Sequence, residues 1–163
     1  MRKIEFEWWH YHEIKMREED AYLSLYADDM GQLGYTLQET SFQAISLEDE
    51  GKVFACAGVG QAGPTVAEAW LYTDERLKKH LRRGSTLLMS EMRAACAEMG
   101  AKRIQIHVHQ DFETSHRWVQ WVGFMPEGYQ PFYYPDGKAA LVYVMYPHIP
   151  RDKWMDLYVR KEE

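Results

Sequence analysis

Three side chains that could move a proton lie in two strand-like segments of this chain. Glu68 lies in the segment 66–73, and His107 and His109 lie two residues apart in the segment 103–109. A carboxylate or an imidazole can take a proton from an attacking nucleophile, and imidazole changes charge closest to neutral pH. Both histidines share one face, because side chains alternate along a strand. Acid–base chemistry is therefore the first expectation for these residues.

Plainer interpretations of the same residues stay open. Two histidines two apart on a strand could bind a metal, but a zinc site needs further ligands. Neither His80 nor His116 lies at a spacing that supplies one, so we expect no metal. Histidines could instead be hydrogen-bonded groups on the face of a sheet, and Glu68 could simply end a strand at the solvent.

The net charge limits the partners of the chain. The formal charge is −6 and the pI is about 5.7, whereas a nucleic-acid surface needs a concentrated basic field. The exception is one short basic run, residues 78–83, with the sequence KKHLRR. We expect any anion bound there to be small, and we expect no nucleic-acid partner.

The two cysteines and the N-terminus bear on the compartment. Cys56 falls in a predicted buried strand, and Cys96 falls on the apolar side of a predicted helix. Without a paired cysteine spacing, free buried thiols are expected rather than a disulfide framework. The first residues have no apolar leader-like run, and no window is apolar enough to cross a bilayer. These features predict a cytoplasmic protein without a membrane partner.

The first half of the chain, judged by its apolar periodicity, predicts mainly strands. The expected elements are a strand over 2–8, a helix over 12–26, a loop over 31–40, strands over 41–48 and 52–59, and a loop over 60–64. The turn signal Asp49-Glu50-Gly51 joins the last two strands, which therefore form an antiparallel hairpin.

The second half alternates strands with helices. The expected elements are a strand over 66–73, a helix over 77–99, a strand over 103–109, a helix over 113–122, and strands over 124–134 and 138–146. Gly100 is expected to end the long helix in a left-handed conformation, and Pro135-Asp136-Gly137 is expected to turn the last hairpin. The sum is an α+β fold with a mixed, mostly antiparallel sheet and helices on both faces. We expect a single domain over 1–146 and a tail over 147–163.

This order of elements resembles the GNAT family of acetyl-CoA-dependent N-acetyltransferases. The resemblance covers residues 41–146 and is carried by four stretches: EAWLYTDE from Glu68, EMGAKRIQIHV from Glu98, HRWVQWVGFMPEG from His116 and YYPDG from Tyr133. Small GNAT-like proteins of phage genomes resemble it most. The resemblance implies a GNAT-like acyl-CoA N-acyltransferase fold, in which the strands 66–73 and 103–109 run parallel and splay apart around acetyl-CoA.

The resemblance also implies where acetyl-CoA would bind. In the family, pantetheine completes the unpaired backbone of the splayed strand, which here assigns Trp70, Leu71, Tyr72 and Thr73 to the donor.

The family holds the pyrophosphate at a glycine-rich turn, written Arg/Gln-x-x-Gly-x-Gly/Ala, before the long helix. The nearest residues here are Arg82, Arg83, Gly84, Ser85 and Thr86, with one glycine where the pattern has two small residues. In the alternative, one helix runs straight through Gly84 and leaves no nest of amides.

The catalytic groups follow from the same resemblance. An attacking amine must lose its ammonium proton, so Glu68 is expected to act as base, with His109 as an auxiliary base. The tyrosine that protonates the thiolate in many members falls at Val119, and the asparagine and small residue before it fall at Phe112 and Ser115. The general acid is therefore expected to be absent, which slows transfer without abolishing it.

The expected activity is transfer of an acetyl group to a primary amine by direct attack in a ternary complex, with acetyl-CoA as co-substrate. Aromatic residues in 8–12 and 129–134 could wall the acceptor pocket, or simply pack the core. Two alternatives lack catalysis: a GNAT-fold protein that binds a protein partner through its aromatic N-terminus or Trp154, and a sensor that binds CoA without turnover. We also expect a homodimer through the last strand and the tail.

Overall fold

The structure is a computed structural model that describes residues 1–15, 17 and 30–157. One mixed sheet of seven strands runs through it, in the order β1-β2-β3-β4-β5-β7-β6. The strands are β1 (Arg2–Glu5), β2 (Ser41–Asp49), β3 (Lys52–Gly63), β4 (Val66–Thr73), β5 (Arg103–His109), β6 (Met125–Gln130) and β7 (Ala140–Met145). All neighbouring pairs are antiparallel except β4 and β5, which are parallel. The expected mixed, mostly antiparallel sheet is confirmed.

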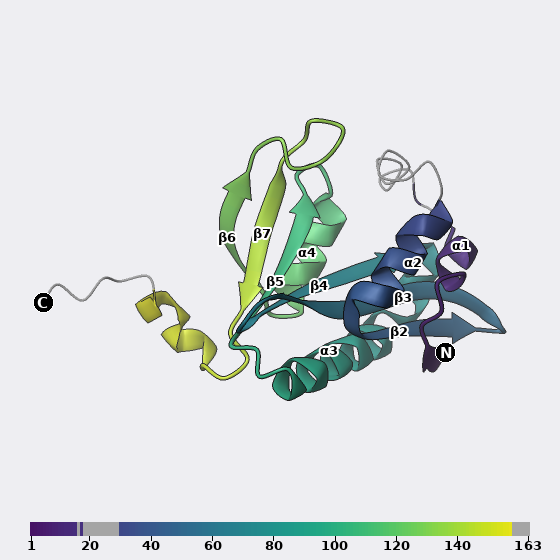
Figure 1. The fold of residues 1–163 in the computed structure, drawn as a ribbon, viewed down its shortest axis with the longest axis horizontal. Coiled ribbons are helices and arrows are strands. Elements are labelled where there is room, and N and C mark those ends of the chain that lie inside the picture. Colours follow the sequence, from purple (N-terminus) through teal and green to yellow (C-terminus); the bar gives the residue numbers. More distant parts are fainter. Residues whose placement is uncertain (16, 18–29, 158–163) are drawn as a thin grey trace, which may run out of the picture.

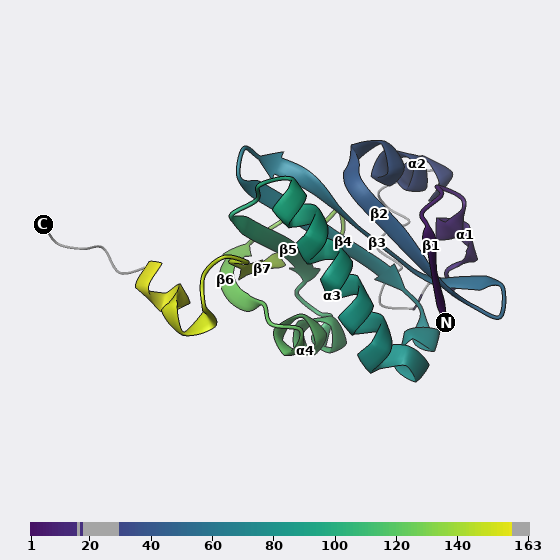
Figure 2. The same ribbon diagram turned by 90° about the horizontal axis from the view of Figure 1, so that it is seen from below.

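The helices cover both faces of the sheet (Figures 1 and 2). They are α1 (His10–Glu13), α2 (Met30–Thr40), the 3-10 helix η2 (Glu75–His80), α3 (Leu81–Glu98), α4 (Glu113–Trp121) and the 3-10 helix η3 (Arg151–Leu157). Helices α3 and α4 pack on one face over apolar clusters that include Leu88, Ala95 and Val119. On the opposite face, Phe6, Ile14 and Leu37 from the α1 and α2 region pack against Val53 and Cys56.

Alternation along β4 and β5 decides which side chains meet which layer. Ala67, Ala69 and Ile106 face the α3 and α4 layer, and Trp70 faces the α1 and α2 layer. Because neighbours on a strand point to opposite faces, Glu68 shares the α1 and α2 face with Trp70. Glu68 therefore lies on the opposite side of the sheet from the apolar cluster under α3 and α4.

Parallel pairing between β4 and β5 is short. Val66, Ala67 and Glu68 pair with Arg103, Ile104 and Gln105, respectively. Beyond these pairs the two strands, both fully described, share no further ladder, and Figure 1 shows β5, β7 and β6 turned away from β2, β3 and β4. The expected parallel, splayed pair is confirmed.

Two glycines adopt the backbone conformation that their positions require. Gly100 follows α3 with φ 68°, and the N–H of Ala101 donates to the carbonyl of Cys96 at 2.9 Å, which closes the helix end. Gly137, with φ 81°, turns the chain before β7. Both were predicted from the sequence.

Several predicted boundaries are wrong. Residues 31–40 form α2 rather than a loop, since Leu33 and Leu37 lie one helical turn apart and only the two glycines suggested a break. Strand β3 continues to Gly63, so the predicted loop over 60–64 is shorter. The predicted helix over 12–26 is wrong at its start, where α1 ends at Glu13; residues 16 and 18–26 lie outside the described residues.

The last hairpin also differs from its prediction. Strand β6 ends at Gln130, and residues 131–139 form an irregular loop that holds Tyr133 and Tyr134. Strand β7 lies between β5 and β6, so the last strand is not an edge of the sheet. The predicted dimer through that strand assumed that the strand is an exposed edge of the sheet, and this assumption is wrong.

The C-terminal segment and the cysteines are tied into the core. Trp154 of η3 is buried beside Tyr146 and donates from Nε1 to the carbonyl of Ile149 at 2.7 Å, so it is not an exposed contact. Cys56 and Cys96 are free and buried, as predicted. Within the described ranges, no helix has the length and apolar character that crossing a bilayer requires.

Candidate active site

A cleft opens where β4 and β5 separate. It has a volume of about 240 Å³ and is lined from both strands, from α4 and from the 131–139 loop. Its walls include Glu68, Leu71, His107, Val119 and Tyr133. Because the strands have parted here, the cleft is bordered by side chains from both faces of the sheet.

Glu68 and His107 form a hydrogen-bonded pair on the wall of this cleft. Nδ1 of His107 lies 3.0 Å from Oε1 of Glu68, and Nε2 of Gln105 donates to Oε2 of Glu68 at 3.3 Å. The Glu68 side chain is 40% exposed, whereas the His107 side chain is 10% exposed. The hydrogen bond from His107 holds the pKa of Glu68 below its ordinary value, although partial burial opposes this shift. Glu68 is therefore a carboxylate that orients an imidazole.

The second ring nitrogen of His107 has no hydrogen-bond partner among the described residues. The ring stacks in parallel on Tyr133, with 4.6 Å between centroids and 4° between planes. With Nδ1 engaged by a carboxylate, the neutral ring carries its proton there and leaves the lone pair on Nε2. This arrangement gives the cleft a group that can accept a proton.

His109 is placed differently, although it lies only two residues further along β5. Its Nε2 lies 2.8 Å from Oδ2 of Asp136, and its Nδ1 accepts from the backbone N–H of Asp111 at 3.3 Å. The side chain is 4% exposed and stacks on Phe112. Both ring nitrogens are engaged, so His109 ties the end of β5 to the loop before β7.

The cleft continues into a groove between the start of α3 and α4. This groove has a volume of about 450 Å³ and is lined by Thr73, Lys78, Leu81, Arg117 and Trp121, among others. Leu71, Ser115 and Trp118 line both the cleft and the groove. A long, thin ligand could therefore run from this groove into the gap between the strands.

The first turn of α3 decides between the two readings of Gly84. The helix begins at Leu81, so Gly84 lies inside it, as the alternative without a glycine nest predicted. A Cβ at Gly84 would lie 3.2 Å from Leu77 and 3.7 Å from both Leu47 and Met1. A side chain at Gly84 would press on Leu77, so close packing toward the sheet favours glycine at this position.

The neighbours of Gly84 divide between the core and the solvent. Ser85 is buried and accepts a hydrogen bond from Nε1 of Trp118 at 2.9 Å, which joins α3 to α4. Arg82, Arg83 and Thr86 are exposed. The cations on the groove wall itself include Lys78 and Arg117.

The backbone predicted to hold the donor lies on the cleft, but its aromatic side chains point elsewhere. Nε1 of Trp70 donates to Ser41 at 2.9 Å, and Tyr72 packs edge-on against Tyr11. Leu71 lines both the cleft and the groove, and Thr73 lines the groove. On the side facing β5, residues Trp70 to Thr73 have no ladder partner in the described sheet. Their backbone can therefore pair with an extended amide-containing ligand.

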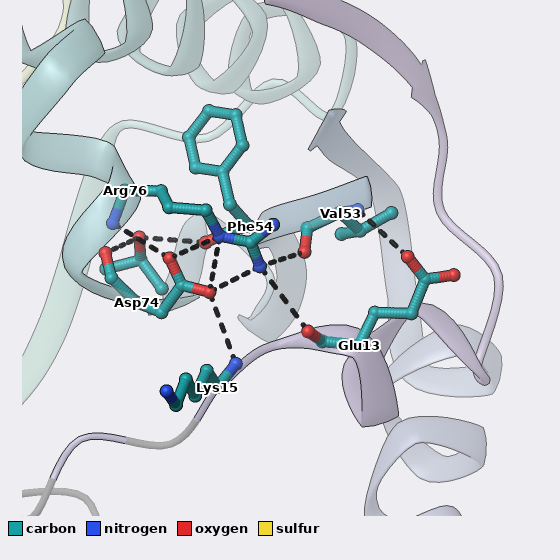
Figure 3. A network of polar contacts seen from close by, with 7 residues as sticks. Glu13, Lys15, Val53, Phe54, Asp74 and Arg76 are labelled. Atoms are coloured by element: carbon teal, nitrogen blue, oxygen red, sulfur yellow. Dashed lines mark hydrogen bonds and ion pairs between the residues drawn. The ribbon is translucent and has the colours of Figure 1, made fainter. Parts of the chain in front are cut away.

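A buried ion pair fixes the end of β4 beside the groove (Figure 3). Arg76 donates from Nε to both carboxylate oxygens of Asp74 at 3.0 Å and from NH2 to the carbonyl of Val53 at 2.7 Å. The backbone N–H of Lys15 also donates to Asp74, at 3.2 Å. Burial alone would raise the pKa of Asp74, but the hydrogen bonds from Arg76 and the backbone outweigh it and lower the pKa. The network holds the N-terminal segment, β3 and η2 together.

Sequence reasoning did not single out the contact of His107 with Glu68 or the cations that line the groove. The alternation along β5 placed His107 and His109 on one face, but only the register of β4 against β5 shows which of them meets Glu68. Lys78 belongs to the basic run that was noted, whereas nothing local marked Arg117. Val119 is buried on the cleft wall, where the resemblance placed it.

Metal and thiol chemistry find little support in this site. Among residues 1–15, 17 and 30–157, no group of three His, Cys, Asp or Glu side chains could hold a metal ion. Burial raises the pKa of Cys56 to about 12 and that of Cys96 to about 11. Neither thiol is therefore a nucleophile near neutral pH.

No protein-family model matches this chain. No curated protein matches its sequence either. The fold, by contrast, is shared with many solved structures.

Three solved structures illustrate the likeness. Ard1 from Thermoplasma volcanium has 20% identity and a TM-score of 0.69, with 89% of this chain and 96% of that chain covered. An aminoglycoside 6'-N-acetyltransferase complexed with coenzyme A has 14% identity and a TM-score of 0.70, with 92% and 98% covered. A GNAT-family acetyltransferase from Bacillus anthracis has 14% identity and a TM-score of 0.67, with 90% and 95% covered. The fold is that of the GNAT acetyltransferases, as the sequence predicted.

Proposed function

We propose that this protein is an acetyl-CoA-dependent N-acetyltransferase of the GNAT type, which acetylates a primary amine. The observation that carries the proposal is the Glu68–His107 pair on the wall of the cleft formed where β4 and β5 part. A proton acceptor beside a gap in a parallel strand pair is what an amine attacking a thioester needs. The likeness in fold to an acetyltransferase that holds coenzyme A supports this choice of donor.

The donor would enter along the groove between α3 and α4. Backbone groups of Trp70 to Thr73 would pair with the pantetheine amides, because β5 leaves them without a ladder. The phosphates would lie at the start of α3, where Lys78 and Arg117 line the groove and residues 82–86 form the first turn. Exposed Arg82 and Arg83 add positive charge, and buried Gly84 and Ser85 hold the turn in place. Bound acetyl-CoA would supply the activated acyl carbon.

The proton of the amine would pass to Nε2 of His107. Glu68 accepts the hydrogen bond from Nδ1 and stabilises the charged ring as it forms. As the nitrogen bonds to the acyl carbon, the bond from that carbon to sulfur breaks and the thiolate leaves. His109 is proposed to position the 131–139 loop through Asp136, since both of its nitrogens are engaged.

The departing thiolate would receive limited help. Val119 occupies the position of the family tyrosine and cannot donate a proton. Ser115, one turn earlier on α4, lines both the cleft and the groove and has no side-chain hydrogen bond within the described part of the chain. Its hydroxyl could donate to sulfur. The raised pKa of both buried cysteines argues for direct transfer in a ternary complex rather than through an acyl-cysteine.

A CoA-binding protein without turnover is the second candidate. Val119 favours it, because a valine cannot supply the proton that the family tyrosine gives to the thiolate. The cytoplasmic location and the likeness to phage proteins remain predictions.

Thermal unfolding and calorimetry with acetyl-CoA and desulfo-CoA, followed by thiol release across a panel of primary amines, separate the candidates. A ligand at 100 times its dissociation constant stabilises a fold by about 2.7 kcal/mol. Binding with amine-dependent thiol release would support the acetyltransferase, and binding without release would support the sensor. No shift at millimolar acetyl-CoA would exclude both.

A further inference from the structure

An apolar chamber lies behind the cleft, between the sheet and α3. It has a volume of about 50 Å³, and its walls include Val59, Ala69, Leu88, Met92, Ile106 and Trp118. At one end Gln43 and Glu91 also line it, and they are hydrogen-bonded to each other at 3.0 Å. The α3 chamber, as we call this space, is separate from the amine-facing side chains of the cleft.

The space is large enough to hold a small chemical group. A void of about 10–15 Å³ already holds one water molecule, and most protein interiors have few voids larger than that. The α3 chamber exists because small side chains, Ala57, Ala69 and Ala95, line it where the strands begin to part. Its largely apolar walls offer water few partners, so an apolar group suits it better.

The α3 chamber adjoins the cleft at the point of the proposed chemistry. Ala69, Leu71, Ile106 and Trp118 line both spaces. Ala69 follows Glu68 directly, and its side chain faces α3 while Glu68 faces the other layer. A thioester between the strands, attacked by an amine from the His107 side, would therefore have its acyl substituent on the chamber side.

Trp118 gives the boundary between the two spaces a fixed shape. Its indole Nε1 donates to the buried Ser85 at 2.9 Å, which holds the ring between α3 and α4. Trp118 is thus held in place on the wall shared by the cleft and the α3 chamber, and Ala69, on the same shared wall, contributes only a methyl group. An acyl chain that entered the α3 chamber from the cleft would have to pass beside this small side chain.

We propose that the donor site takes acyl-CoA thioesters longer than acetyl-CoA, with the propionyl or butyryl chain in the α3 chamber. This inference rests on the proposed function. Each methylene moved from water into an apolar site strengthens binding about fourfold. Propionyl-CoA should therefore bind about four times more tightly than acetyl-CoA, and butyryl-CoA about four times more tightly again.

Calorimetric titration with CoA, acetyl-CoA, propionyl-CoA, butyryl-CoA and octanoyl-CoA tests the proposal and needs no acceptor. Affinity that rises to butyryl-CoA and falls at octanoyl-CoA is expected from the limited volume. If propionyl-CoA and butyryl-CoA bind no more tightly than acetyl-CoA does, the inference is overturned and the proposed function is left intact. Failure of CoA and every thioester to bind would instead overturn the proposed function.

Two variants place the effect in the α3 chamber. Ala69→Val adds bulk to the wall that the α3 chamber shares with the cleft. It should reduce the preference for butyryl-CoA over acetyl-CoA from about sixteenfold to less than threefold. Met92→Ala enlarges the space from α3 and should move the optimum to a longer chain. It keeps the proposal testable if the valine variant fails to fold. Ala62→Val, on an exposed part of β3, is the matched control and should leave the series unchanged. An unchanged series in both chamber variants would contradict the assignment.

Discussion

Two histidines of β5 show how differently neighbouring regions of this molecule use the same side chain. His107 and His109 lie on one face, and each has a carboxylate within 3.0 Å. Glu68, the partner of His107, is 40% exposed on the wall of the cleft, and Nε2 of His107 is left for a ligand. His109 is 4% exposed, with both nitrogens engaged.

The difference comes from what lies across from each residue. His107 faces the gap left by β4, where ring and carboxylate border a cleft. His109 also borders the cleft, but Tyr134 and Asp136 of the 131–139 loop pack against its ring and engage its Nε2. A histidine–carboxylate pair therefore indicates function only where the surrounding chain leaves a nitrogen accessible. Changes that affect one pair and spare the other test this comparison.

The largest effect is expected from His107→Gln. Removing the proton acceptor should lower kcat by about 10²- to 10³-fold, because general base catalysis contributes on that scale. The rate of thiol release with an amine that the wild type acetylates measures it. The affinity for acetyl-CoA should stay the same, and exposed His148→Gln serves as the control. Retention of more than a third of the wild-type rate would rule out His107 as the base.

His109→Ala should act mainly on stability. Loss of the bond to Asp136 and of the stack on Phe112 should lower the free energy of unfolding by about 2 kcal/mol. For a chain of this size that corresponds to roughly 4–8 °C in Tm. Thermal unfolding and kcat would be measured on the same preparation. A large loss of kcat with an unchanged Tm would return His109 to the role of a base.

Glu68→Gln should have a smaller effect on rate, of about tenfold, because the imidazole stays in place. The rate of thiol release with an amine that the wild type acetylates measures the loss. A rate equal to that of the wild type would show that Glu68 does not act on the proton acceptor.

The smallest effect concerns acid stability, in which both pairs should behave alike. The pKa values of Glu68 and Asp136 are lowered in the folded protein from 4.5 and 3.8. A lowered pKa contributes stability that is present above the ordinary value and lost as pH falls through the folded value. Because both carboxylates are partly exposed, each contribution should stay below about 1 kcal/mol.

Glu68→Gln and Asp136→Asn, unfolded thermally at pH 7 and at pH 3, measure these contributions. Each variant should be slightly less stable than the wild type at pH 7 and nearly equal to it at pH 3. A deficit that grows toward pH 3 would contradict the direction of both shifts.

Much of the fold could be predicted because its signals are local. Alternation marked β2, β4 and β5. Gly100 marked the end of α3, and Gly137 marked the turn before β7. Helix α2 was missed because two glycines outweighed a short apolar repeat, although packing of Leu37 against the sheet stabilises it. Helix propensity predicts such a segment poorly, because tertiary contacts decide whether the helix forms.

The candidate site was predictable only in part. Glu68 and the two parting strands, β4 and β5, were predicted from the sequence, and they line one cleft. A helix through Gly84 was one of two open interpretations, and the packing of Gly84 toward the sheet was not predicted, since local sequence does not show which side of a helix meets the sheet. The sequence predicted His109 as the auxiliary base. It could not distinguish His109 from His107, because their alternation is identical and their surroundings were unknown.

By itself, the sequence determined the order of the elements from β2 to β7, the faces of β4 and β5, and a mixed sheet with helices on both sides, because these follow from periodicity along one segment. Only the tertiary structure decided that Glu68 meets His107, that Asp136 meets His109, and that an apolar space lies behind Ala69. Those outcomes depend on the register of strands that are distant in the chain and on how far they separate. Many long-range contacts set both quantities together, and no single segment records them.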